Sequence, residues 1–142
     1  MNRINHAAVI LCAVLCYGIE SLWFGVLFGK QWLTALGTTV PELMARMEGR
    51  PLWPLYAGAY ACDVVFVYVL AWALVKTGVQ NALGGMKVAA ILWLGFVVTV
   101  TITNYSFELR SLALMAIDAG CPLIGMLVTG AILGAWRNRA SD

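Results

Sequence analysis

Long apolar stretches alternate along the chain with short polar segments. An α-helix needs roughly 20 apolar residues to cross the hydrocarbon of a bilayer, whereas strands of a membrane barrel alternate in polarity over about ten residues. The apolar stretches here are continuous and have no Lys or Arg away from their ends. Residues 1–142 are therefore predicted to form one all-α domain, an integral membrane four-helix bundle, with spans at about 6–28, 53–75, 86–107 and 111–136.

The first connection, about 29–52, is the longest. Within it, Thr39 and Glu42 have the spacing of a capping box, and Pro41 suits the first turn of a helix. Apolar residues follow on one side of the segment. A short interfacial helix at about 40–48, lying on the membrane surface, is predicted; the alternative is a tethered loop. The second connection is short and polar, and the third is a tight hairpin at about 106–111.

Composition supports lipid as the solvent of this fold. Apolar residues make up 62% of the chain and charged residues 11%, against about 25% charged in soluble domains. The net charge of +2 is scattered and excludes a nucleic-acid partner. Five basic residues lie at the termini and in the second loop, against four in the first and third loops. This bias predicts that both termini lie in the cytoplasm. We expect a multi-pass protein of a bacterial inner membrane.

Three of the predicted spans contain a carboxylate. An ionisable side chain at the bilayer centre costs about 2.5–3.5 kcal/mol, so these groups are expected to face the bundle interior, where they are protonated, hydrogen-bonded or in contact with water. Chain direction places them, with polar residues near the third hairpin, toward the face of the first and third loops. The predicted site is a shallow vestibule formed by Glu20, Asp63, Asn104, Glu108, Arg110 and Asp118.

Two functions fit such a site. The first is a proton- or cation-linked transporter of a small cation or solute. The second is a structural or interaction subunit of a membrane assembly, in which the polar groups form a hydrogen-bond network between helices. An enzyme is not expected, because neither HExxH nor GxSxG occurs; the remaining enzymatic hypothesis is an aspartyl-type pair of Asp63 and Asp118.

Neither a metal nor a cofactor is predicted. The cysteines have no CxxC spacing and no neighbouring histidine, so we expect them to pack as small apolar side chains. They all fall within predicted spans, at Cys12, Cys16, Cys62 and Cys121.

Small residues recur at helical spacing in the first and fourth spans. The pairs Gly25-xxx-Gly29 and Gly130-xxx-Gly134 permit close helix approach, either within the bundle or across a homodimer. Residues 22–25, Leu-Trp-Phe-Gly, also resemble residues 92–95, Leu-Trp-Leu-Gly. This similarity hints at a duplicated two-helix hairpin.

Two longer passages resemble a known family. One is Leu-Trp-Phe at 22–24, followed by Phe-Gly-Lys-Gln-Trp at 28–32; the other is Thr-Asn-Tyr-Ser-Phe-Glu-Leu-Arg-Ser at 103–111. Together they resemble the small integral-membrane family catalogued as domain of unknown function 1761, over nearly the whole chain. The resemblance implies four spans and supplies no catalytic residues. Glu20 stands where glycine is more usual in the family.

Overall fold

The computed structural model describes residues 4–136, and within this range the chain is helical with no strand. Four helical segments are long and apolar enough to span a membrane, which confirms the predicted all-α membrane fold. Two of them run without interruption, and two contain a short π-helical segment. Their bounds are His6–Leu27, Trp53–Lys76, Ala82–Phe107 and Leu112–Ala135.

The interrupted spans are the first and the third. The first consists of α1 (His6–Leu22) and the π-helical η1 (Trp23–Leu27). The third consists of α5 (Ala82–Leu92), the π-helical η2 (Trp93–Val98) and α6 (Thr99–Phe107). The uninterrupted spans are α4 (Trp53–Lys76) and α7 (Leu112–Ala135).

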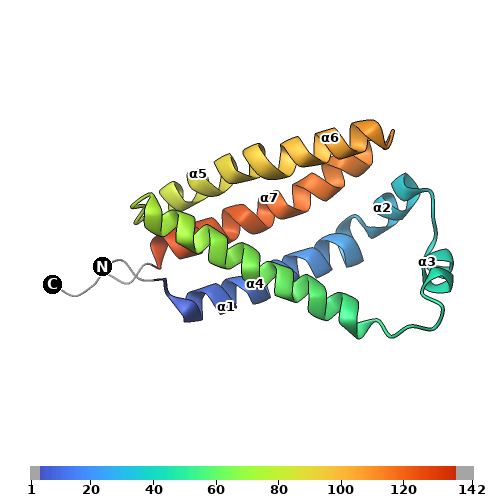
Figure 1. The fold of residues 1–142 in the computed structure, drawn as a ribbon, viewed down its shortest axis with the longest axis horizontal. Coiled ribbons are helices and arrows are strands. Elements are labelled where there is room, and N and C mark those ends of the chain that lie inside the picture. The colour runs from blue at the N-terminus through green and yellow to red at the C-terminus, as the bar shows by residue number, and fades with distance from the viewer. Residues whose placement is uncertain (1–3, 137–142) are drawn as a thin grey trace.

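The helix α7 lies at the centre of the bundle, in contact with α1, α4 and α5 (Figure 1). The start of α1, the α4–α5 connection and the end of α7 lie at one end of the bundle, which we call the terminal end. The first loop and the α6–α7 turn lie at the other, the loop end (Figure 1). The basic residues Arg3, Arg137 and Arg139, used to predict orientation, lie outside the described residues.

The first loop contains two helices, α2 (Gly29–Leu36) and α3 (Val40–Arg46). The predicted capping box is present at α3: the Thr39 hydroxyl accepts from the Glu42 amide, and the Glu42 carboxylate accepts from the Thr39 amide at 2.9 Å. A short helix therefore forms where one was predicted, and it ends at Arg46 rather than at 48. The helix α2 was not predicted.

The third span begins at Ala82 rather than at 86, because Asn81 is an N-cap whose side chain accepts from the Gly84 amide at 2.7 Å. Gly85 therefore lies inside α5 and packs against α7. A Cβ added at Gly85 would overlap the Gly130 carbonyl oxygen, and a Cβ at Gly130 would lie 2.7 Å from the Gly85 oxygen. The Gly130–Gly134 pair thus brings α7 close to α5 within one bundle.

The other predicted glycine pair does not pack within the bundle. A Cβ added at Gly25 would meet nothing within 4 Å, and one at Gly29 would overlap only the carbonyl of Phe24, five residues earlier in the same segment. Among residues 4–136 of this chain, no other helix therefore packs closely at Gly25 or Gly29. The reason is that η1 ends the first span between them, so the two residues do not share one helical face. Contact across a homodimer stays a prediction.

Dense packing is concentrated at the terminal end. Val9, Val67, Leu70 and Leu74 are each at most 1% exposed and belong to one core cluster. By contrast, η1, η2 and α6 contribute no buried residue. The bundle is therefore closed at the terminal end and loosely packed toward the loop end.

Candidate functional site

A cavity of about 210 Å³ lies between α1, α4, α7 and η2, next to the core cluster. Asp63 of α4 and Glu20 of α1 both line it. Asp63 is only 6% exposed, and its Oδ2 atom has no hydrogen-bond partner among the described residues. An unpaired polar atom buried away from solvent is costly, so the Asp63 carboxyl group needs a partner supplied from within the cavity.

The remaining wall of this cavity is largely apolar. Phe66, Val97 and Pro122 contribute carbon surface, and no Lys or Arg among residues 4–136 lines the cavity. The buried Cys16 and Cys121 and the exposed Cys62 also line it. Three thiols that we expected only to pack thus lie around one space with two carboxyl groups.

Glu20 also borders a second hollow on the side of the loop end. This hollow measures about 430 Å³ and is lined by Tyr17, Phe24 and Tyr56 as well as Glu20. The Glu20 carboxyl group therefore stands between the buried cavity and a wider, aromatic-lined space. Toward the terminal end, the buried side chains of the core cluster close the bundle.

Asp118 of α7 belongs to a different polar cluster. Its Oδ1 accepts from the Trp32 indole at 2.9 Å, and its Oδ2 accepts from the Tyr105 hydroxyl at 2.5 Å. Trp32 lies on α2 and Tyr105 on α6, so one carboxyl group links the first loop to the third and fourth spans. Sequence analysis did not identify Trp32 as a partner, because its position beside the first loop suggested only an interfacial aromatic residue.

The α7 backbone on both sides of Asp118 accepts hydrogen bonds from two further tryptophans. Pro122 lies inside α7 and has no amide hydrogen to donate to the Asp118 carbonyl. The carbonyls on either side accept indole hydrogen bonds: Trp23 donates to Ile117 at 3.1 Å, and Trp93 donates to Ala119 at 2.8 Å. Neighbouring side chains commonly satisfy backbone groups around a proline in a membrane helix.

Trp23 and Trp93 occupy equivalent places in the two similar tetrapeptides of the sequence. Each is the first residue of a π-helical segment, η1 or η2, and each donates to α7. The repeated Leu-Trp-x-Gly pattern was therefore the available sequence signal for these hydrogen bonds. A π-helical turn inserts an extra residue and commonly occurs at functional sites.

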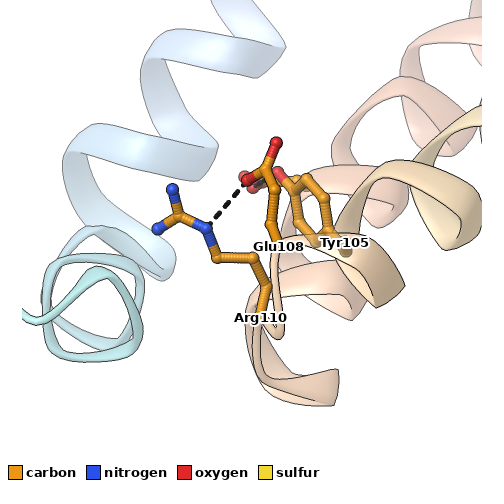
Figure 2. Close-up of polar contacts among 4 residues, drawn as sticks. Tyr105, Glu108 and Arg110 are labelled. Carbon is orange, nitrogen blue, oxygen red and sulfur yellow. Dashed lines mark hydrogen bonds and ion pairs between the residues drawn. The ribbon is translucent and has the colours of Figure 1, made fainter.

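The other predicted site residues are Asn104, which lies within α6, and Glu108 and Arg110, which lie in the α6–α7 turn. Arg110 donates to Glu108 at 3.0 Å, and both side chains are exposed (Figure 2). They pair with each other, whereas Asp118 accepts from Trp32 and Tyr105. Asn104 is exposed. The six predicted site residues thus divide into a cavity pair, an Asp118 cluster and an exposed group near the turn.

The arrangement assigns different chemistry to the three membrane carboxylates. Asp118 has two hydrogen-bond donors from the protein, as a structural carboxylate requires. Glu20 and Asp63 share a cavity that offers them no cationic side chain. Two negative charges in such a place require a proton or a bound cation.

Fold and site together define a small all-α protein with four membrane-length helices and a carboxylate-lined cavity beside its packed core. The chain belongs to the family described as "Protein of unknown function (DUF1761)", whose model matches residues 7–134. This match confirms the family resemblance noted in the sequence. No curated protein and no solved structure matches the chain.

Proposed function

We propose that the protein is a proton- or cation-linked transporter of a bacterial inner membrane, and that Glu20 and Asp63 bind the coupling ion. The observation that supports this proposal is the Asp63 carboxyl group, which lies in a cavity that it shares with Glu20. Asp63 is only 6% exposed, and its Oδ2 atom has no hydrogen-bond partner among the described residues. Membrane-embedded acids without a basic partner are typical of proton and ion pathways. We propose no enzymatic role, since Asp63 and Asp118 have separate surroundings.

The proposed site is closed toward the terminal end of the bundle. The hollow beside Glu20 lies toward the loop end, whereas Val67, Leu70 and Leu74 fill the space between the cavity and the terminal end. With both termini in the cytoplasm, as the charge bias predicts, this conformation receives its ion from the outer side. Passage to the cytoplasm then requires the terminal-end core to open.

Proton flux in reconstituted vesicles tests the proposal. We expect a membrane potential to drive uptake of protons, read by a pH-sensitive dye inside the vesicle, and we expect Glu20→Gln and Asp63→Asn to abolish it. Glu48→Gln is the matched control, because Glu48 lies in the first loop and its side chain is 72% exposed. Absence of flux in the wild type, or equal flux in all four proteins, would refute the proposal.

A structural role is the second candidate for the Asp118 cluster alone. Its two hydrogen bonds join α2, α6 and α7, which is how polar side chains stabilise membrane helix packing. Asp118→Asn is therefore expected to lower the thermal stability of the protein while carboxylate-dependent flux is retained. If the whole protein is only a structural subunit, substitutions at Glu20 and Asp63 will alter stability or assembly, and no flux will be found.

A further inference from the structure

We infer that the cavity and the adjoining hollow bind an organic cation with apolar substituents, of the quaternary ammonium or phosphonium type, rather than a bare metal ion. The inference rests on the proposed function because it uses the same two carboxyl groups. It adds the chemical class of the ligand, and the evidence is the size of the space, the chemistry of its walls and the place where it opens.

The available space suits a small organic molecule. Glu20 lines both the cavity of about 210 Å³ and the hollow of about 430 Å³. Sites for small organic ligands typically enclose about 300–1,000 Å³, so the hollow alone has the volume of such a site and the cavity adds space on the other side of Glu20. A dehydrated metal ion would leave most of this volume without contacts.

The walls combine acids with aromatic and aliphatic surface. Phe66 and Val97 lie in the cavity with Asp63, while Tyr17 and Tyr56 lie in the hollow with Glu20. Aromatic faces attract organic cations, and carboxylates neutralise them. Alkyl or aryl substituents of the cation would pack against the aliphatic wall, so the site offers contacts to both parts of such a ligand.

The same walls do not provide the ligands that a metal ion requires. Hard cations require six or more oxygen ligands, and zinc requires four ligands in a tetrahedron. Between residues 4 and 136, no group of three or more His, Cys, Asp or Glu side chains is placed to hold a metal ion. Although three thiols line the cavity, they and the acids are spread around its wall and do not converge on one point.

The cavity also opens where an apolar cation would arrive. Cys62 lines the cavity and is exposed, whereas its neighbour Asp63 is buried. Cys62 lies near the middle of a membrane-length helix, so its exposed side chain faces the region that acyl chains fill in a bilayer. A membrane-soluble cation can therefore reach the carboxyl groups laterally, by a route that a hydrated ion does not take.

Equilibrium binding of radiolabelled tetraphenylphosphonium to the purified full-length protein in detergent tests the inference. We expect saturable binding that Glu20→Gln and Asp63→Asn each weaken by about tenfold or more. Each substitution removes one negative charge of the protein that attracts the cation. Acidic pH should weaken binding in the wild type by protonating the carboxyl groups. Glu48→Gln should bind as the wild type does, and a thermal melt of each variant confirms that it is folded.

Cys62→Trp separates this inference from the proposed function, because it narrows the lateral opening and leaves both carboxyl groups in place. We expect it to lose tetraphenylphosphonium binding and to retain proton flux. Proton flux without tetraphenylphosphonium binding in the wild type would overturn the inference and leave the proposed function intact. Binding that Asp63→Asn leaves unchanged, or that sodium or zinc ions displace at micromolar concentration, would also overturn it.

Discussion

Substitution of Gly85 by alanine tests the packing on which the bundle depends. Gly85 of α5 lies against the Gly130 carbonyl and 3.2 Å from the Gly134 Cα, measured from the place that a Cβ would take. All of these neighbouring atoms belong to backbone and not to flexible side chains. An added methyl group can therefore be accommodated only if α5 and α7 move apart.

The size of the effect follows from a comparison with Gly18→Ala. Gly18 lies in α1, and a Cβ there would meet nothing within 4 Å. Both substitutions gain the same helix propensity, about 0.8–1.0 kcal/mol, so their difference isolates the overpacking cost, which is about 1–3 kcal/mol. At about 3 °C per kcal/mol for a chain of this size, Gly85→Ala should melt about 3–9 °C below Gly18→Ala.

Thermal unfolding of both variants in the same detergent, followed by circular dichroism, measures this difference. Wild-type protein and a Gly130→Ala variant complete the series, and Gly130→Ala should resemble Gly85→Ala because the two positions face each other. Equal melting temperatures for Gly85→Ala and Gly18→Ala would show that α5 and α7 do not approach at this glycine, and the described packing would be wrong.

Two further predictions concern the polar contacts outside the cavity. Trp32→Phe and Tyr105→Phe each remove one hydrogen-bond donor to Asp118, and each should lower the free energy of unfolding by about 0.5–2 kcal/mol. In a protein that already carries Asp118→Asn, either substitution should lower the free energy of unfolding by clearly less. Full additivity of the two effects in this double-mutant cycle would contradict the network. Hydrogen bonds from Thr38 and Thr39 lower the pKa of Glu42 below its ordinary value of 4.5. The stabilisation of α3 that results is present above pH 4.5 and is lost as pH falls through the lowered pKa. The protection factors of the α3 amides, which correct for the intrinsic pH dependence of exchange, should therefore fall there, and Glu42→Gln should remove this pH dependence.

The membrane spans were predictable from sequence because lipid allows few alternatives. A long apolar segment in a bilayer must satisfy its own backbone, and a helix does so locally. The start of α3 was predictable for a similar reason, since its capping box depends on residues three positions apart. The helix α2 was missed because its polar first residues, Lys30 and Gln31, break the apolar pattern, and its Trp32 is fixed by Asp118, which lies far away in the sequence.

The division of the polar site was not predictable in the same way. Sequence position gives the depth of a residue along a span, but it does not give the rotation of the helix that carries it. The π-helical segment that begins at Trp93 also adds a residue to a turn, so the face assigned by a 3.6-residue period no longer applies to Tyr105 on α6. Their similar depth in the membrane predicted that Asp63 and Asp118 lie in one site. The rotation of α4 and α7 about their axes instead gives the two carboxyl groups different neighbours.

The indole bonds around Pro122 give α7 a mechanical connection to two other spans. The indoles of Trp23 and Trp93 donate to the carbonyls of Ile117 and Ala119. These residues lie just before Pro122, which interrupts the backbone hydrogen bonds of α7. A shift of the first span against the third must therefore bend α7 at this weak point or break one of these bonds. Because Pro122 itself forms part of the cavity wall, every such bend reshapes the space around Asp63.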